Sequence, residues 1–270
     1  MLHRLYHPKF VVAFVLGLLS LGSLQPAAAQ ERDLHIETFI YGARDKVVSE
    51  NLTLFTRGRV YDFRRDPSSH EVLEIAVYDP QRQQFDLFDV VGRRRMTVRE
   101  QEILDMLALL VSNPDVTKRD PMLFDPREME AMEEDYDPAT GWITLTSRNG
   151  RLTYRAHGSA PRNPDALGPY VSFVDWYSRL NGTNPHRMPP FARLQLNKRL
   201  LRYGILPDEI ELDYSPPGLL GNDVAVKSKH FVTWGLNPSD QALIEDLTKW
   251  VELPRVEMAQ YYSPAGAERR

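Results

Sequence analysis

Histidine and carboxylate side chains are the groups of this chain that could carry acid–base or metal chemistry. The sequence has seven histidines, and His3 and His7 lie within the first 29 residues. The other five are scattered: His35, His70, His157, His186 and His230. None of these five lies three or four residues from another, as two metal ligands on one turn of a helix would. We therefore expect neither a metal site nor a cofactor.

The motifs of known catalytic machineries are missing from the sequence. It contains no G-x-S-x-G, S-x-x-K or H-E-x-x-H motif and no glycine-rich phosphate loop. It has no cysteine, which excludes a thiol nucleophile and a thiolate metal site. If the protein is a hydrolase, we expect the site to use His157, His230 and an acidic patch. The acidic patch consists of Glu128, Glu130, Glu133, Glu134, Asp135 and Asp137.

Three other charged patterns have simple structural interpretations. Residues 135–141 resemble the start of a calcium loop, but Thr146 stands where an EF-hand needs its twelfth-position Glu. We expect an acidic turn there. The arginine run 93–95 could bind a phosphate group, although a solvated hairpin is the simpler interpretation. Asp86 and Asp89 are three residues apart on an expected strand, so they point to opposite faces and cannot act as a catalytic pair.

An aromatic segment and an apolar helix are the best candidates for a binding surface. Residues 170–180 carry four aromatic side chains at helical spacing, and residues 100–111 form a helix with a wide apolar arc. Core packing is one interpretation of both. The other is an apolar ligand cleft or a partner surface, because Tyr and Trp combine a large apolar area with a polar tip. The side chains of that candidate surface are Leu107, Leu110, Tyr170, Phe173, Trp176 and Tyr177.

The first 29 residues have the pattern of a secretory signal peptide. Arg4 and Lys9 provide the positive start, the apolar run 10–19 follows, and Pro26 precedes three alanines. The run is too short for a resident membrane helix, which needs about 20 apolar residues. We expect cleavage after residue 29 and an exported, periplasmic or extracellular protein that does not span a membrane.

The charge of the chain argues against nucleic acid as a partner. The sequence has 33 Lys and Arg against 37 Asp and Glu. Without the two basic residues of the expected signal peptide, 31 remain against 37, a net charge of −6. A mildly acidic surface of this kind suits a soluble protein and not an anionic polymer or membrane. An envelope protein or a lipid remains a possible partner.

The order of expected elements is strands first, then strands and helices mixed. We expect a signal peptide (1–29), a lead-in (30–48), a single α+β domain (49–252) and a flexible tail (253–270). Within the domain, residues 51–98 alternate as an antiparallel meander, and Thr97 with Glu100 fits a capping box for the helix that follows. Asn149-Gly150 predicts a tight type I′ hairpin. Further helices are expected at 170–180, at 191–203 and after Asn237, with strands at 209–214 and 224–234.

This layout resembles the periplasmic lipoprotein carriers. The similarity lies in the early strands, the apolar helix, the late segment from Gly204 to Leu212, and the strand to Trp234 followed by Leu236-Asn237-Pro238. It covers roughly residues 50–251 and rests on pattern alone. The resemblance implies an antiparallel half-barrel sheet with helices on its concave face and an apolar cavity for acyl chains. The helices at 170–180 and 191–203 are additions to the carrier layout.

Three functions remain open from the sequence. The first is a non-catalytic envelope protein that binds a lipid, an acyl chain or a protein partner in an apolar cleft. The second is a hydrolase with an unrecognised site. The third is a purely structural or interaction protein. The sequence also leaves open whether the sheet is an open half-barrel or encloses a filled core.

Overall fold

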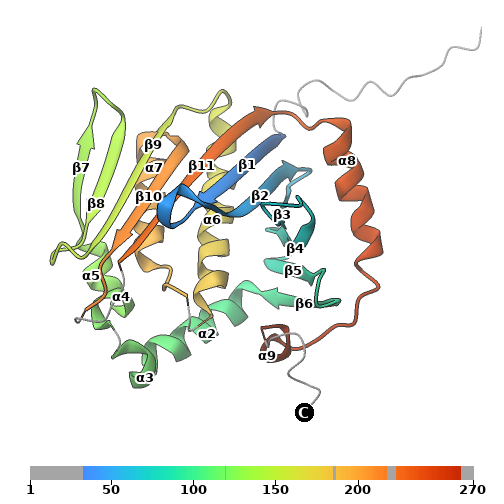
Figure 1. Ribbon diagram of the computed structural model, residues 1–270, viewed down its shortest axis with the longest axis horizontal. Coiled ribbons are helices and arrows are strands. Elements are labelled where there is room, and N and C mark those ends of the chain that lie inside the picture. Colours follow the sequence, from blue (N-terminus) through green and yellow to red (C-terminus); the bar gives the residue numbers. More distant parts are fainter. Residues whose placement is uncertain (1–32, 119, 185–186, 218–222, 263–270) are drawn as a thin grey trace, which may run out of the picture.

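An open antiparallel sheet forms the centre of the molecule. The computed structural model describes residues 33–118, 120–184, 187–217 and 223–262, so the expected signal peptide lies outside the described residues. The sheet has 11 strands in the order β6-β5-β4-β3-β2-β1-β11-β10-β9-β8-β7 and does not close on itself (Figure 1). The expected α+β class with an antiparallel sheet is confirmed.

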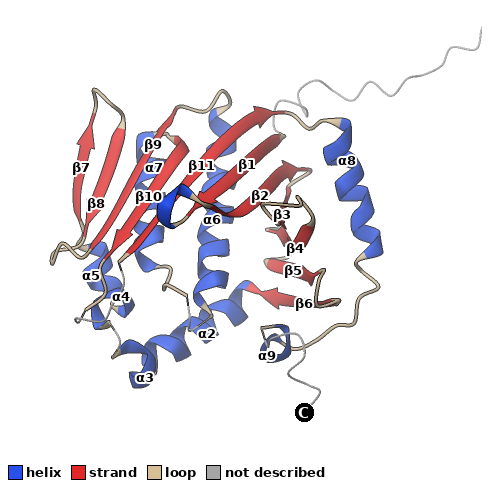
Figure 2. Cartoon of the chain, viewed as in Figure 1, coloured by secondary structure: helices blue, strands red, loops and turns tan. Residues whose placement is uncertain are grey.

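The elements follow one another in two strand-rich halves (Figure 2). The strands are β1 (Leu34–Tyr41), β2 (Val47–Thr56), β3 (Arg59–Arg65), β4 (Val72–Asp79), β5 (Gln84–Asp89), β6 (Arg94–Arg99), β7 (Glu133–Asp137), β8 (Trp142–Thr146), β9 (Leu152–Ser159), β10 (Leu206–Tyr214) and β11 (Val224–Trp234). The α-helices are α2 (Glu100–Ser112), α3 (Pro114–Thr117), α4 (Pro121–Phe124), α5 (Pro126–Glu130), α6 (Leu167–Gly182), α7 (Phe191–Tyr203), α8 (Pro238–Glu245) and α9 (Met258–Tyr261). Short 3-10 helices are η1 (Ala43–Asp45), η2 (Pro164–Ala166) and η3 (Asp246–Lys249).

In the middle of the sheet, the first strand of the chain, β1, pairs with the last strand, β11. Strand β1 pairs with β2 on one side and with β11 on the other, and Leu34 lies opposite Trp234. The residues expected as a lead-in therefore contain a central strand. Burial alternates along β1, with Leu34 and Ile36 facing the interior, because successive side chains of a strand point to opposite faces.

Helices α6 and α7 cover one face of the sheet, which we call the inner face. Figure 1 shows α6 crossing behind the central strands and α7 behind β9 and β10. Under α6, the rings of Phe55, Tyr78 and Phe85 meet Phe173, with centroids 5.8–6.5 Å apart. Under α7, a second cluster joins apolar residues of β8, β9 and β10. The helices expected at 170–180 and 191–203 are confirmed.

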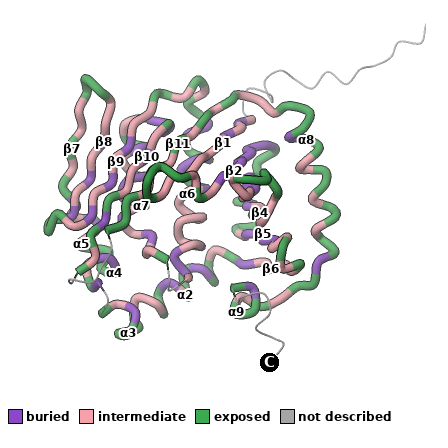
Figure 3. Tube along the Cα trace, in the orientation of Figure 1, coloured by how far each residue is buried: buried purple, intermediate pink, exposed green. Residues whose placement is uncertain are grey.

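The other face, the outer face, is covered over only one half of the sheet. Leu52, Leu54 and Phe63 point outward from β2 and β3, and residues of α8, η3 and Trp250 pack on them. The outer residues of β9 and β10 have no helix over them in the described part of the chain. Figure 3 shows buried and more exposed residues alternating along the strands.

Two expected details of the turns and caps are wrong. Helix α2 has Arg99 as its N-cap and Glu102 as the partner in the capping box, because Thr97 is still in β6 and bonds Asp86. The Asn149-Gly150 turn is not type I′, because only Gly150 has positive φ, at 69°.

The end of the described chain is attached to the edge of the sheet. The backbone N–H of Arg95 donates to the Pro254 carbonyl, and that of Val256 donates to the Arg95 carbonyl, at 2.9 and 2.8 Å. Helix α9 follows, and Tyr261 is 4% exposed. Residues 253–262 of the expected flexible tail therefore dock on β6. None of the described helices has the length and apolar composition needed to cross a membrane.

Candidate functional site

A continuous row of polar side chains crosses the inner face of the sheet. Its members are directly opposed on neighbouring strands from β11 through β1 to β6. We call it the polar row, and it consists of His230, Thr38, Asn51, Arg64, Glu74, Asp89 and Arg94. The rest of the inner face is mainly apolar, so the polar row marks the part of the interior that can recognise a polar ligand.

A pocket of about 200 Å³ opens over the β3–β5 part of the polar row. Arg64, Glu74 and Asp89 form its sheet side. The opposite side comes from the end of α6, the loop after it and the end of the described chain: Tyr177, Leu180, Asn181, Arg187, Tyr261 and Tyr262. We call this the inner pocket. It combines ring faces, hydroxyl groups, an amide and charged groups in one concave site.

The charges on the sheet side of the inner pocket are already paired. Arg64 Nε donates to Glu74 Oε2 at 3.1 Å, and Arg94 Nε donates to Asp89 Oδ2 at 2.9 Å. The Tyr261 hydroxyl donates to the other oxygen of Glu74 at 3.0 Å. Both carboxylates are therefore held as hydrogen-bond acceptors, and neither is a free base.

A buried carboxyl group lies beside the inner pocket on the same face. Asp62 is 3% exposed and accepts hydrogen bonds from Thr53 Oγ1 at 2.7 Å and Asn51 Nδ2 at 2.9 Å. Burial raises the pKa of the Asp62 carboxyl, and hydrogen bonds from Thr53, Asn51 and Tyr177 oppose this. Burial also raises the pKa of Tyr177 well above its usual value, and the charges of Asp62 and Glu74 add to the effect.

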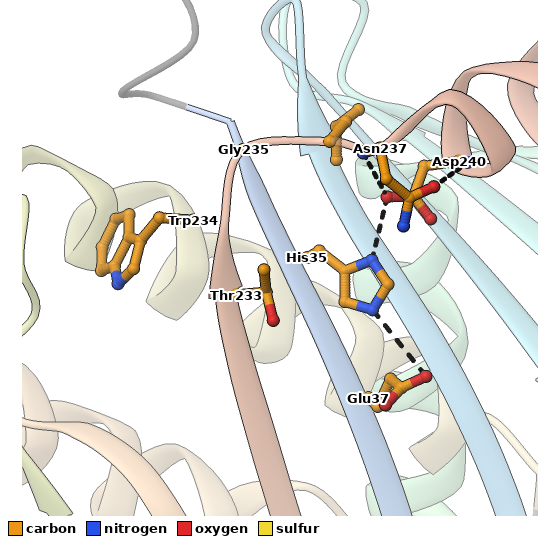
Figure 4. A pocket seen from close by; sticks show the side chains of 8 residues that line it. His35, Glu37, Thr233, Trp234, Gly235, Asn237 and Asp240 are labelled. Carbon is orange, nitrogen blue, oxygen red and sulfur yellow. Dashed lines mark hydrogen bonds and ion pairs between the residues drawn. The ribbon is translucent and has the colours of Figure 1, made fainter.

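A second, larger pocket of about 360 Å³ lies on the outer face beside the start of α8. Figure 4 shows the His35 ring between Asp240 and Glu37, with Trp234 pointing away to the other side of its strand. His35 Nδ1 is 3.0 Å from Asp240 Oδ2, and Nε2 is 3.9 Å from Glu37 Oε1. Thr233 lies directly opposite His35 on β11.

The His35–Asp240 pair attaches α8 to the sheet. Asp240 is 2% exposed, and its Oδ2 also accepts the backbone N–H of Asn237 at 2.9 Å in the capping box of α8. A carboxylate that holds one ring nitrogen of histidine leaves the other available for proton transfer. None of the hydrogen bonds among the described residues connects His35 Nε2 to a hydroxyl nucleophile. The arrangement therefore contains the histidine and the carboxylate of a catalytic triad.

The residues expected to line an apolar cleft lie mostly in the interior cluster under α6. Leu107, Tyr170 and Phe173 are buried there, and Trp176 and Tyr177 pack against it half-buried. Leu110 is half-buried on α2 outside that cluster. Five of the six side chains are thus brought together, and Tyr177 alone also lines the inner pocket.

The residues expected for a hydrolase are not brought together. His157 points outward from β9 and bonds Asp208 at 2.8 Å, whereas His230 points inward from β11 and bonds Thr38 at 2.9 Å. In the acidic patch, Glu134 pairs with Arg199 and Arg202 of α7. The described residues contain no group of three or more His, Asp or Glu side chains that could hold a metal ion.

The other charged patterns have local roles. Asp137 accepts the N–H of Ala139 at 2.9 Å and the hydroxyl of Thr140 at 2.6 Å, so the candidate calcium loop is an acidic turn. These hydrogen bonds lower the pKa of Asp137. Arg95 Nε donates to the Leu253 carbonyl at 2.9 Å, so one arginine of the run 93–95 holds the end of the described chain.

Sequence reasoning missed the inner pocket and His35. The polar row depends on strand register, and no local spacing relates Arg64 to Glu74 or Asp89. Asp86 and Asp89 do point to opposite faces: Asp86 bonds Thr97, and Asp89 lines the inner pocket. The one local signal for the outer pocket is the Asn-Pro-x-Asp sequence at 237–240, which places a buried carboxylate at the start of α8.

Comparison with known proteins assigns no relative. No protein-family model matches the chain, and no curated protein is significantly similar to it.

Proposed function

We propose that the protein is an exported, non-catalytic binding protein of the cell envelope whose inner pocket holds a small, polar, uncharged molecule rich in hydroxyl groups. In this proposal the open sheet is a half-barrel with α6 and α7 on its concave face. The signal-peptide pattern of residues 1–29 supports the exported location.

The pairing of both carboxylates in the inner pocket carries the proposal. Glu74 is neutralised by Arg64 and Asp89 by Arg94, so no carboxylate in the pocket needs a cation from a ligand. A ligand meets hydroxyl groups, tyrosine ring faces, and the Asn181 amide, whose oxygen already accepts a hydrogen bond from the Arg187 guanidinium at 2.8 Å. These groups suit hydrogen bonds to a neutral polar molecule and stacking on its apolar side.

The packing under α6 favours this ligand over the acyl chain that the sequence suggested. Phe55, Phe85, Tyr170 and Phe173 fill the space between the sheet and α6 with ring contacts. An acyl chain would have to displace these rings, because close-packed interiors leave few voids. The inner pocket accepts a small molecule without that rearrangement.

A ligand screen tests the proposal. Native mass spectrometry of gently purified protein, followed by a thermal-shift screen with neutral mono- and disaccharides and polyols, should reveal one bound class. Tyr177→Phe and Asn181→Ala should weaken its binding about tenfold each, because each removes a hydrogen-bonding group worth about 1 kcal/mol or more. Asn149→Ala, in an exposed turn, is the matched control and should leave binding unchanged.

The alternative outcomes of that screen are informative. A copurified lipid, or tight binding of a fluorescent fatty acid with none of the saccharides bound, would replace the polar ligand with an acyl chain. Equal binding by Tyr177→Phe, Asn181→Ala and the control would move the site away from the inner pocket.

A hydrolase is the second candidate, and the His35–Asp240 pair in its outer pocket is the observation that favours it. His35 would act as a general base, held by Asp240. A screen of esterase, glycosidase and peptidase substrates should then show an activity that His35→Ala removes and His157→Ala leaves intact. Activity that survives His35→Ala would exclude this candidate.

A further inference from the structure

The carboxylate acceptors of the inner pocket already hold hydrogen bonds from within the protein. Glu74 accepts at each oxygen, from Arg64 at 3.1 Å and from the Tyr261 hydroxyl at 3.0 Å. Asp89 also accepts at each oxygen, from a backbone N–H of the β5–β6 turn at 2.7 Å and from Arg94 at 2.9 Å. A ligand therefore meets no carboxylate oxygen in this pocket that lacks an internal donor.

The opposite side of the inner pocket has an excess of donors. Arg187 Nη1 donates to Asn181 Oδ1 at 2.8 Å, and both side chains line the pocket. None of the other N–H groups on these two side chains has an acceptor among the described residues. Because Arg187 holds the amide oxygen, the Nδ2 group is the part of Asn181 that a ligand can bind.

The charges that line the inner pocket balance. Arg64 and Arg187 are positive, and Glu74 and Asp89 are negative. Arg187 is exposed, so water solvates its charge and a counter-charge from a ligand contributes little. An anionic ligand would share the pocket with two carboxylates, whereas a neutral acceptor meets no like charge. The free donors therefore favour a neutral oxygen.

A carbonyl oxygen suits these donors better than a hydroxyl group does. A hydroxyl that accepts from Asn181 or Arg187 brings a hydrogen that needs an acceptor of its own, whereas a carbonyl oxygen brings none. Leu87 and Leu180, each 3% exposed, line the same pocket and offer contact to a small apolar group. A short acyl group combines a carbonyl oxygen with a methyl group, so it matches both features.

We propose that the ligand of the inner pocket is a neutral sugar with a short acyl group, whose carbonyl oxygen accepts hydrogen bonds from Asn181 and Arg187. This inference rests on the proposed function and narrows its ligand class. Arg187 has two roles in it: it binds the acyl oxygen, and it orients the Asn181 amide. The Tyr261 hydroxyl donates to Glu74, so its oxygen remains an acceptor for an N–H or a hydroxyl group of the sugar.

Calorimetric titration of the full chain with matched sugars tests the acyl group. The probes are N-acetylglucosamine, 6-O-acetylglucose, glucose and glucuronate. We expect at least one acetylated sugar to bind about tenfold more tightly than glucose, because it gains a hydrogen-bonded carbonyl group. Glucuronate should bind no more tightly than glucose. Preference for one acetylated sugar over the other assigns an N-acyl or an O-acyl group.

The other outcomes separate this inference from the proposed function. Equal binding of glucose and both acetylated sugars overturns the acyl group and leaves a neutral sugar as the ligand. Glucuronate as the tightest ligand overturns it as well, because the donors then take an anion. Absence of binding by all four probes overturns both proposals.

Two variants and a control define the role of Arg187. Arg187→Met should reduce the affinity for the acetylated sugar to about that of glucose, and Arg187→Lys should retain part of the preference. Arg162→Met removes an exposed arginine between β9 and η2, outside the pocket lining, and should keep the full preference. Circular dichroism and the urea midpoint establish that each variant is folded. An undiminished preference in Arg187→Met overturns the assignment of Arg187.

Discussion

The two halves of the sheet bury their outer faces differently. In the half formed by β2–β5, outward residues such as Leu54 and Phe63 are apolar, and α8 with η3 covers them. In the half formed by β8–β10, outward residues are polar or charged except for Trp142, which packs against Arg155. Glu211 lies between Arg155 at 2.8 Å and Lys227 at 3.4 Å. The first half needs a helix on each face, whereas the second is stable with one, because cross-strand polar pairs can face water.

On the inner face, the first half is the more polar of the two. The first half carries most of the polar row and the buried Asp62, whereas the second half presents Leu145, Leu152 and Ile210 to α7. The half with two covered faces therefore also contains the polar interior. Apolar packing on the outer face offsets the free-energy cost of burying polar groups on the inner face. The inner pocket therefore lies on the half of the sheet that is covered on both faces.

The largest expected effect is the removal of an outer core side chain in the first half. Leu54 is fully buried, so Leu54→Ala should reduce the free energy of unfolding by about 2–5 kcal/mol. Thr153→Ala, on the outer face of the second half, should change it by less than about 0.5 kcal/mol. Urea unfolding measures both. Similar losses would mean that the outer faces contribute equally.

The second expected effect is the release of α8 from the sheet. Asp240→Ala removes the N3 carboxylate of the α8 capping box and the partner of His35, and should cost about 1–3 kcal/mol. Limited proteolysis after residue 236 and the fluorescence of Trp250 should detect loosening of this segment before global unfolding. Asp246→Ala, an exposed residue of η3, is the control. Unchanged proteolysis in Asp240→Ala would show that apolar packing alone holds α8.

The third prediction concerns pH and the buried carboxyl of the first half. Because the pKa of Asp62 is raised in the folded protein, the folded state favours its protonated form. This contribution is present below the unfolded pKa of about 3.9 and is lost as pH rises through the folded pKa. Asp62→Asn should therefore be more stable than the wild type at pH 7, and the difference should shrink towards pH 4. Melting temperatures of both proteins between pH 4 and pH 7 measure this difference. A variant that is less stable than the wild type at pH 7 would contradict the prediction.

The smallest expected effect is on the charge ladder of the second half. Glu211→Ala removes the acceptor of Arg155 and Lys227, and should cost at most about 1 kcal/mol, because exposed ion pairs contribute little. The cost should fall in 1 M salt, where the Debye length is about 3 Å. A cost that does not depend on salt would indicate packing instead of charge.

Local signals in the sequence predicted the elements well where only neighbouring residues decide them. Helix α7 runs from Phe191 to Tyr203 and ends at Gly204, which has φ 67°, as its sequence indicates. The type I′ turn occurs at Arg57-Gly58, where both residues have positive φ, and not at Asn149-Gly150. Strand length and pairing fix the loop length, so a preferred dipeptide alone does not determine the turn.

The features that the sequence could not predict depend on contacts between residues far apart in the chain. Strand β1 lies in the expected lead-in, and its central place in the sheet could not be predicted, because its pairing with β11 joins opposite ends of the chain. The inner pocket likewise combines Arg64 on β3 with Tyr261 on α9. The aromatic residues of α6 were found from their spacing. Spacing alone left open whether Phe173 and Tyr177 face a filled core or a pocket, since both contexts place apolar side chains on one side of a helix.

The pairing of β1 with β11 also sets the order in which the molecule can be assembled. Until the chain reaches Trp234, the strands can form two separate meanders, each with an unpaired central edge at β1 or β10. Closing the gap between them requires contacts between the first and last strands, which are entropically costly and slow to form. An incomplete chain thus lacks the final native state. It also exposes two edges that can aggregate, so truncation before β11 should give insoluble protein.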